Sequence, residues 1–125
     1  MLGKADATPM IAVKDIDRAK QFYTDKLGLK PVQEMGGDFF MLKSGDTTLN
    51  VYRSEFAGTN KATALTFDVD DIDAEVRELK DKGITFEHYD VQGLKADGDI
   101  YSGEGIKTAW FKDPDGNILS LVEES

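Results

Sequence analysis

The chain contains the stretch Val13-Lys14-Asp15-Ile16-Asp17, which recurs 56 positions later as Val69-Asp70-Asp71-Ile72-Asp73. An apolar run typical of a strand precedes each copy, at residues 10–13 and 64–69. After each copy, apolar residues recur at spacings of three and four, which is the pattern of an amphipathic helix. The sequence therefore predicts a strand followed by a helix, present twice.

Both predicted helices carry residues suited to their ends. Asp15 and Asp71 are expected N-caps, because a short carboxylate accepts hydrogen bonds from the first free backbone N–H groups. Gly28 and Gly83 are expected to end the helices, since glycine readily takes the left-handed conformation that commonly follows a helix. The interval from cap to glycine is one residue shorter in the second copy.

Three strands are predicted after each helix. They lie near residues 30–34, 39–43 and 48–52 in the first copy, and near 85–90, 108–112 and 118–122 in the second. The last two strands are joined by Asp113-Pro114-Asp115-Gly116-Asn117, whose residue types favour a turn. The Gly-rich stretch 93–105 lacks the Lys-Ser/Thr ending of a phosphate-binding loop, and we interpret it as a mobile loop.

The predicted fold class is α+β, with two βαβββ modules in a single domain spanning residues 1–125. Module one covers about residues 8–53 and module two about 63–123, with a polar, aperiodic linker at 54–62. A module of roughly 60 residues cannot bury both faces of its sheet well, so the two modules are expected to pair.

The composition indicates where the protein is located and excludes several classes of partner. The chain has 125 residues, no cysteine and a net charge of −9, which excludes disulfides, zinc–thiolate sites and thiol nucleophiles. No apolar run approaches the roughly 20 residues of a membrane span, and no signal peptide is recognisable, so a cytoplasmic location is expected. Nucleic acid and anionic membranes are poor partners for an acidic chain without a basic stripe.

The repeat and its motifs resemble the vicinal oxygen chelate superfamily of glyoxalases, bleomycin-resistance proteins and extradiol dioxygenases. The stretches that carry the resemblance are residues 13–23, Leu27-Gly28-Leu29 and residues 111–117. The resemblance implies two modules whose sheets curl into a half-barrel around a ligand cavity, with the helices outside. It also implies a homodimer, since a second chain often completes the cavities of this family.

The metal site of the family is where this chain departs from the pattern. Metalloenzymes of the family use His and Glu at four places, which the resemblance carries over to about Thr8, Asn50, Ala64 and Ser120. None of these side chains is a carboxylate or an imidazole, the ligands that divalent cations need. Even a shift of two residues offers only Met10, Thr66 and Val122 as replacements. We therefore expect neither a bound metal nor another cofactor.

Strand alternation extends this inward-facing set to a candidate ligand-binding lining. The candidate ligand-binding residues are Met10, Asn50, Tyr52, Thr66, Asp68, His88, Tyr101, Trp110 and Ser120. Trp110 fits a core position and a ligand-stacking position equally well. His88, the only histidine, is either an exposed strand residue beside Glu87 or a polar group of the cavity.

Two functions follow from this lining. The first is a metal-free small-molecule binding protein that sequesters a cationic or aromatic drug-like compound and so confers antibiotic resistance. Length, acidity, absent metal ligands and Pro9 resemble the bleomycin-resistance proteins in particular. The alternative is a glyoxalase-like or lyase-type enzyme without the usual metal, with a carboxylate or His88 as general base.

Overall fold

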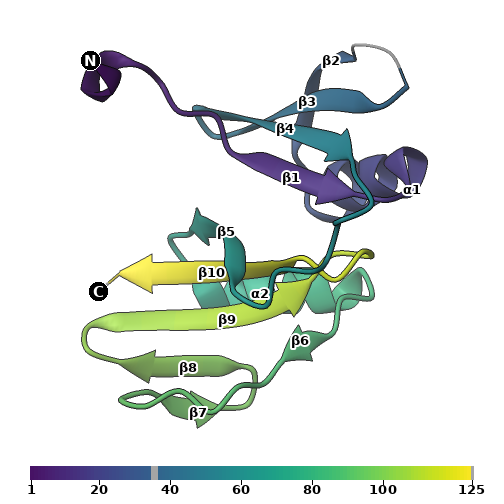
Figure 1. The fold of residues 1–125 in the computed structure, drawn as a ribbon. Coiled ribbons are helices and arrows are strands. Elements are labelled where there is room, and N and C mark those ends of the chain that lie inside the picture. Colours follow the sequence, from purple (N-terminus) through teal and green to yellow (C-terminus); the bar gives the residue numbers. More distant parts are fainter. Residues whose placement is uncertain (35–36, 125) are drawn as a thin grey trace. The chain divides into compact units, whose positions relative to one another are not determined.

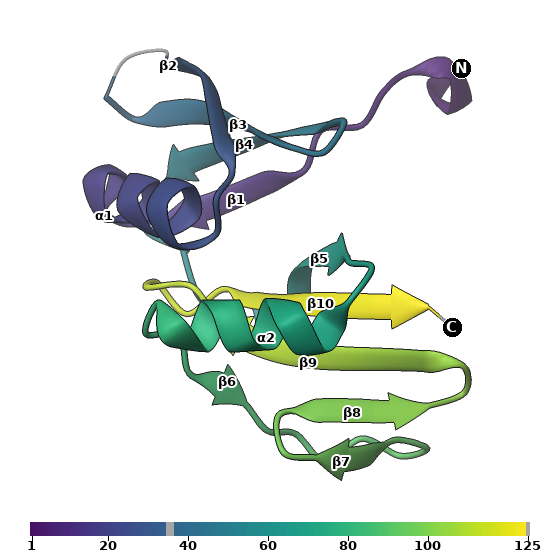
Figure 2. The same ribbon diagram turned by 180° about the vertical axis from the view of Figure 1, so that it is seen from behind.

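The computed structural model describes residues 1–34 and 37–124. The chain divides into two compact units, Met1–Gly58 and Thr59–Ser125. In each unit a β-sheet carries a helix on one face (Figures 1 and 2). This mixed architecture confirms the predicted α+β class, whereas the proposed bounds of the modules and linker stay a prediction.

Unit 1 holds a four-stranded sheet in the order β1-β4-β3-β2, in which β1 and β4 are parallel. Its elements are η1 (Leu2–Lys4), β1 (Met10–Val13), α1 (Ile16–Lys20), η2 (Gln21–Lys26), β2 (Lys30–Glu34), β3 (Phe39–Ser44) and β4 (Thr47–Arg53). One face of the sheet is buried against the helix. Its side chains are Ile11, Val13, Phe40, Leu42, Leu49 and Val51.

The helix of unit 1 changes from α to π geometry partway along. Asp15 caps its start, accepting a hydrogen bond from the Arg18 backbone N–H at 3.1 Å. In η2, the N–H of Leu27 donates to the carbonyl of Phe22, five residues back, at 3.1 Å. This wider turn lets the adjacent residues Phe22 and Tyr23 both be buried.

Unit 2 repeats the strand–helix start and ends in a larger sheet. Its elements are β5 (Thr63–Asp68), α2 (Ile72–Asp81), β6 (Phe86–Glu87), β7 (Lys95–Asp97), β8 (Ile100–Gly103), β9 (Ile106–Lys112) and β10 (Ile118–Glu124). The strand order is β5-β10-β9-β8-β7, and the short β6 also pairs with β9. Asp71 caps α2 by accepting from the Ala74 N–H at 3.2 Å, and Gly83 ends it with φ of 90°.

The prediction of a mobile loop at residues 93–105 is wrong, because this stretch contains the antiparallel hairpin β7–β8. Its glycines serve turns and close packing. Gly98 takes a positive φ in the turn between the two strands. At Gly103 a Cβ atom would meet the Gly93 carbonyl oxygen at 2.4 Å, so only glycine fits there. High glycine content therefore marks tight backbone geometry here.

The turn between β9 and β10 is organised by one buried carboxylate. Asp113, 4% exposed, accepts hydrogen bonds from the backbone N–H groups of Asp115 and Asn117 at 2.9 and 2.8 Å. Its second oxygen accepts from Asn117 Nδ2 at 2.8 Å. These contacts fix the turn that joins the antiparallel strands β9 and β10. Over residues 1–34 and 37–124, no helix is long and apolar enough to cross a bilayer.

Candidate functional site

In unit 1, the candidate residues lie on the sheet face turned away from the buried core. The register aligns Met10, Asn50 and Met41 in one row, and Ala12, Tyr52 and Phe39 in the next. The Asn50 amide nitrogen lies 3.5 Å from the Met10 sulfur, a weak acceptor. Asn50 Oδ1 is buried without a hydrogen-bond partner in the part of the chain that the structure describes. We call this surface the Asn50 face.

In unit 2, the register places Thr66, Ser120 and Trp110 in one row across β5, β10 and β9. The hydroxyl groups of Thr66 and Ser120 are hydrogen-bonded at 2.7 Å. The next row contains Asp68, Val122, Thr108 and Tyr101. We call the sheet face that carries these two rows the Trp110 face.

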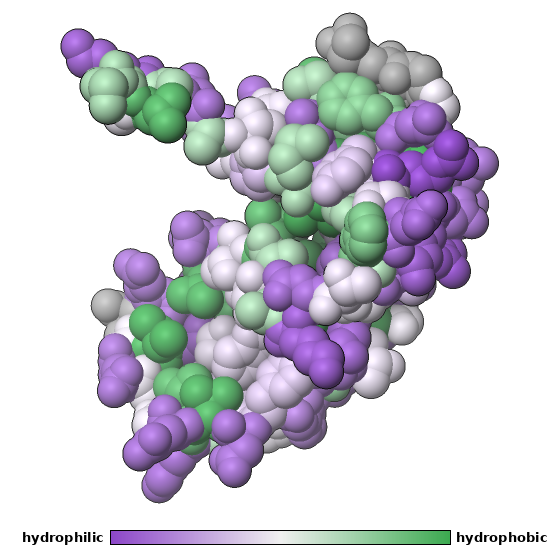
Figure 3. Space-filling view, in the orientation of Figure 1, coloured by the Kyte–Doolittle hydropathy of each residue, from purple (hydrophilic) through white to green (hydrophobic). Residues whose placement is uncertain are grey.

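The Trp110 face lies on the side of the sheet opposite to α2 (Figures 1 and 2). Hydrophobic side chains and side chains of intermediate hydropathy cover much of this face, and hydrophilic side chains gather along its outer edges (Figure 3). The core aromatics Phe86 and Phe111 point to the other side, where both are buried. Trp110 is therefore a half-buried residue of the open face and not part of the helix-packed core.

Two tyrosines fix the ring of Trp110. The rings of Tyr101 and Tyr89 meet it edge-on, with centroids at 5.2 and 5.5 Å. The Tyr101 hydroxyl in turn accepts a hydrogen bond from the Tyr89 backbone N–H at 2.8 Å. Burial, and then the negative charge of Glu87, raise the pKa of Tyr89, so its phenol stays protonated at neutral pH.

Sequence reasoning missed Tyr89, because it follows the two-residue strand β6 and belongs to no motif. The usable signal was alternation. It assigns Tyr89 to the same face as Glu87, and the structure then identifies that face through the pairing of Glu87 with Trp110.

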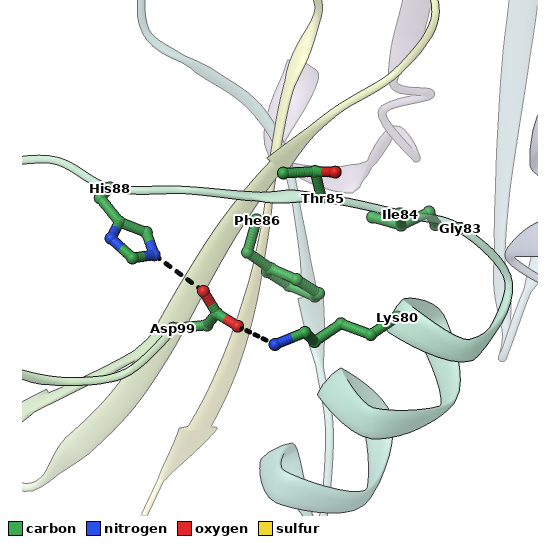
Figure 4. Close-up of a pocket in the computed structure, with 7 residues that line it drawn as sticks. All are labelled: Lys80, Gly83, Ile84, Thr85, Phe86, His88 and Asp99. Atoms are coloured by element: carbon green, nitrogen blue, oxygen red, sulfur yellow. Dashed lines mark hydrogen bonds and ion pairs between the residues drawn. The ribbon is translucent and has the colours of Figure 1, made fainter.

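The structure places His88 apart from the row of Trp110 and Ser120. His88 Nε2 lies 2.7 Å from Asp99 Oδ1, and Lys80 Nζ lies 2.7 Å from Asp99 Oδ2 (Figure 4). Hydrogen bonds from Lys80 and then from His88 lower the pKa of Asp99. A hollow of about 470 Å³ adjoins this cluster, lined by Lys80, Gly83, Ile84, Thr85, Phe86, His88 and Asp99. Neither Lys80 nor Asp99 was singled out by the sequence.

The donor atoms on the two faces do not fit a divalent cation. Across β1 and β4 the residue facing Asn50 is Met10, and across β5 and β10 the residue facing Ser120 is Thr66. Ala64 is the extra residue at an irregularity of the β5–β10 register and has no donor side chain. Within the described residues, no group of three or more His, Asp or Glu side chains could hold a metal ion.

Comparisons with known proteins agree with this fold. A solved glyoxalase family protein from Enterococcus faecalis is 27% identical, with a TM-score of 0.74 over 98% of this chain and 100% of that one. TnmS3, an antibiotic binding protein from Streptomyces sp. CB03234, is 20% identical, with a TM-score of 0.71 over 98% of each chain. The uncharacterized protein YetH of Bacillus subtilis (strain 168) is 28% identical over 96% of this chain and 98% of its own length.

The sequence pattern of one family extends over nearly the whole chain. Residues 7–121 match that pattern, so the match includes both strand–helix repeats and the Asp113 turn. The two sheets, each with its helix on one face, are the architecture shared with the solved relatives. The chain therefore belongs to the Glyoxalase/Bleomycin resistance protein/Dioxygenase superfamily.

Proposed function

We propose that this protein binds and sequesters a small aromatic molecule, with a preference for cations, and that it does so without a metal. The observation that carries the proposal is the half-buried Trp110, which shares a row of the sheet with the Thr66–Ser120 hydroxyl pair. An indole ring offers stacking area, and hydroxyl groups offer hydrogen bonds, but neither is a good ligand for a divalent cation. Such a mixture of apolar and a few polar groups is typical of small-molecule sites.

The packing around Trp110 supports a binding role. Because Tyr89 and Tyr101 hold the indole edge-on, the ring is already fixed before a ligand arrives. A ligand that stacks on it then loses less affinity to ordering of the side chain. The Asn50 face offers a second set of groups of the same kind, with the thioether of Met10, the phenol of Tyr52 and an unpartnered amide oxygen.

Acidic side chains at the edge of the Trp110 face support the preference for cations. Asp68 is exposed at the end of β5. Together with Asp70 and Glu124 it lines a hollow of about 300 Å³. In a chain of net charge −9, these carboxylates attract a cationic ligand towards the face. The likeness to TnmS3, which is described as antibiotic binding, agrees with a drug-like ligand and a role in resistance.

The alternative function is a glyoxalase-like or lyase-type reaction without a metal. The observation that favours it is the pair formed by His88 and Asp99. When a carboxylate accepts a hydrogen bond from one imidazole nitrogen, the tautomer is fixed and the other nitrogen can accept a proton. A relative named as a glyoxalase family protein, at 27% identity, agrees with this alternative.

The proposal is tested with three probes that share one ring system and differ in charge. These are 1-naphthylmethylammonium, 1-naphthalenemethanol and 1-naphthalenesulfonate, with bleomycin as a larger cation. Affinity is measured by calorimetry, and the site is located by the shift of the Trp110 indole N–H signal. We expect the two cations to bind best, and the naphthyl cation to exceed the alcohol and the sulfonate. A probe at about 100 times its Kd should stabilise the fold by about 2.7 kcal/mol.

Two charge-matched variants assign the cation preference. Asp68→Asn should weaken the cations and leave the neutral alcohol unchanged. Asp81→Asn removes the same charge at the exposed end of α2 and should change the affinity of neither the cations nor the alcohol. Best binding of the sulfonate, or binding that leaves the Trp110 signal unmoved, contradicts the proposal. Turnover of an added metabolite by metal-free protein favours the enzyme instead.

A further inference from the structure

Three elements of unit 2 meet at a single carboxylate outside the Trp110 face. Asp99 lies in the turn between β7 and β8, Lys80 in the last turn of α2, and His88 just after β6 (Figure 4). Each oxygen of Asp99 has its own partner, Lys80 Nζ on one side and His88 Nε2 on the other, both at 2.7 Å. The Asp99 side chain is only 18% exposed, whereas those of Lys80 and His88 are about half exposed.

The charge of this cluster depends on His88. Lys80 carries a fixed positive charge and Asp99 a negative one, since hydrogen bonds from Lys80 and His88 lower the pKa of Asp99. With a neutral imidazole, Nε2–H donates a hydrogen bond to the ionised carboxylate of Asp99. Protonation of the imidazole adds a full positive charge at the same distance, so an attraction between opposite charges is added to the hydrogen bond. The hairpin β7–β8 is therefore held more firmly when His88 is charged.

The hairpin connects the cluster to Trp110 through one buried ring. Tyr101, which is 4% exposed, lies on β8 two residues after Asp99. Its ring meets the imidazole of His88 edge-on at 6.5 Å and the indole of Trp110 at 5.2 Å. The contacts thus run from His88 through Tyr101 to Trp110 without a gap.

The other charged groups that face Trp110 are of a different chemical kind from the imidazole of His88. Glu87 faces Trp110 across β6 and β9, and its Oε1 lies 3.7 Å from Lys112 Nζ. Carboxylates ordinarily titrate near pH 4 and lysines above pH 10, whereas imidazole titrates near pH 6.5. Substitution of His88 therefore separates an effect of the imidazole on Trp110 from an effect of Glu87 or Lys112.

We propose that Lys80, Asp99 and His88 form a proton-sensitive cluster that positions Tyr101 and, through it, Trp110. Asp99 is a positioning residue, because it acts on the Trp110 face through the hairpin and not by contact with a ligand. Resting on the proposed function, the cluster also makes ligand binding depend on pH. A neutral ligand should bind more tightly at pH 5.5 than at pH 8. The expected ratio is about twofold to fivefold, the range that one partly exposed ion pair contributes.

The chain carries its own reporters, with one histidine and one tryptophan. The experiment is an NMR titration of the full-length protein from pH 5 to 8, without ligand. It follows the ring carbon protons of His88 and the indole N–H of Trp110. We expect both signals to move with a common midpoint. His88→Gln should abolish the pH-dependent movement of the Trp110 signal.

Two further variants separate positioning from a general change in fold. In Asp99→Asn the imidazole still titrates, but the Trp110 signal should no longer follow it. Lys112→Met removes a charge close to Trp110 while leaving the cluster intact, so here the shared midpoint should persist. Circular dichroism at each pH confirms that the variants are folded. A Trp110 signal that stays constant while His88 titrates overturns the proposal, as does movement that persists in His88→Gln or Asp99→Asn.

The titration and the binding test fail independently. If no naphthyl probe binds but Trp110 follows His88, the proposed function is wrong and the proton-sensitive cluster stands. If 1-naphthalenemethanol binds with equal affinity at pH 5.5 and 8, regulation of the face by the cluster is wrong.

Discussion

Replacement of Asp113 by alanine should be among the most damaging single changes in unit 2. The side chain is 4% exposed and accepts three hydrogen bonds, two from backbone N–H groups and one from the Asn117 amide. A hydrogen bond to a charged group contributes about 1.5–3 kcal/mol, and a donor left buried without a partner costs about 1–3 kcal/mol. Water can reach part of this turn, because Asp115 is only half-buried. We therefore expect Asp113→Ala to lower the free energy of unfolding by about 3 kcal/mol.

Two milder variants give the series its internal control. Asp113→Asn keeps one oxygen to accept from both backbone N–H groups but turns its amide nitrogen towards Asn117 Nδ2. We therefore expect the free energy of unfolding to fall by about 1.5 kcal/mol. Asn117→Ala removes the hydrogen bond from Asn117 Nδ2 to Asp113 but keeps the one from its backbone N–H, so we expect the free energy of unfolding to fall by about 1 kcal/mol.

Urea unfolding followed by the fluorescence of the single Trp110 measures all three variants. With a slope of about 1.5 kcal/mol per molar urea, Asp113→Ala should lower the midpoint by about 2 M. A loss below about 0.5 kcal/mol for Asp113→Ala would refute the reasoning, as would Asp113→Asn being equally destabilising.

Four other outcomes are expected. Gly83→Ala should cost about 1 kcal/mol in urea unfolding, because φ is 90° there, whereas Gly3→Ala, with nothing within 4 Å, should cost close to nothing. Asp99→Asn should be less stable than the wild type at pH 6, and the difference should shrink as the pH falls from about 4 to 2. The sign follows from the lowered pKa of folded Asp99, since stability gained from the ionised carboxylate is lost as it is protonated. Elemental analysis of protein purified without chelator should find well below one zinc, nickel, manganese or iron per chain. Sedimentation at micromolar concentration should show a homodimer, and a monomer there would contradict the expectation from the family.

Local signals in the sequence were sufficient for most of the fold. The caps at Asp15 and Asp71 form the predicted backbone hydrogen bonds, and Gly28 and Gly83 have the predicted positive φ. In β1 and β4 the buried side chains Ile11, Val13, Leu49 and Val51 stand at every second position, which is the alternation of a strand with one face towards a core. These features depend on neighbours in the chain, so one sequence is enough to find them.

Features that depend on pairing between distant segments were missed. The hairpin β7–β8 has little apolar alternation, so its glycines indicate a flexible loop. The structure shows instead that Gly103 packs closely against the backbone of Gly93. The contact of Lys80 with Asp99 spans 19 positions and that of His88 spans 11, without any motif to link them. The face of Trp110 was undecided because it depends on the register of β9 against β10, which the structure supplies.

The π-helical turn of unit 1 accounts for the difference in length between the two repeats. From Asp15 to Gly28 the chain has one residue more than from Asp71 to Gly83, although both helices begin at an aspartate cap and end at a glycine. A single residue inserted into an α-helix is absorbed when one turn widens, and η2 is such a turn. The extra residue is therefore accommodated inside the helix of unit 1, which has an aspartate cap and a terminal glycine of positive φ, as α2 has. Two repeats of one motif can in this way differ in length inside an element while the residues that begin and end it stay of the same type.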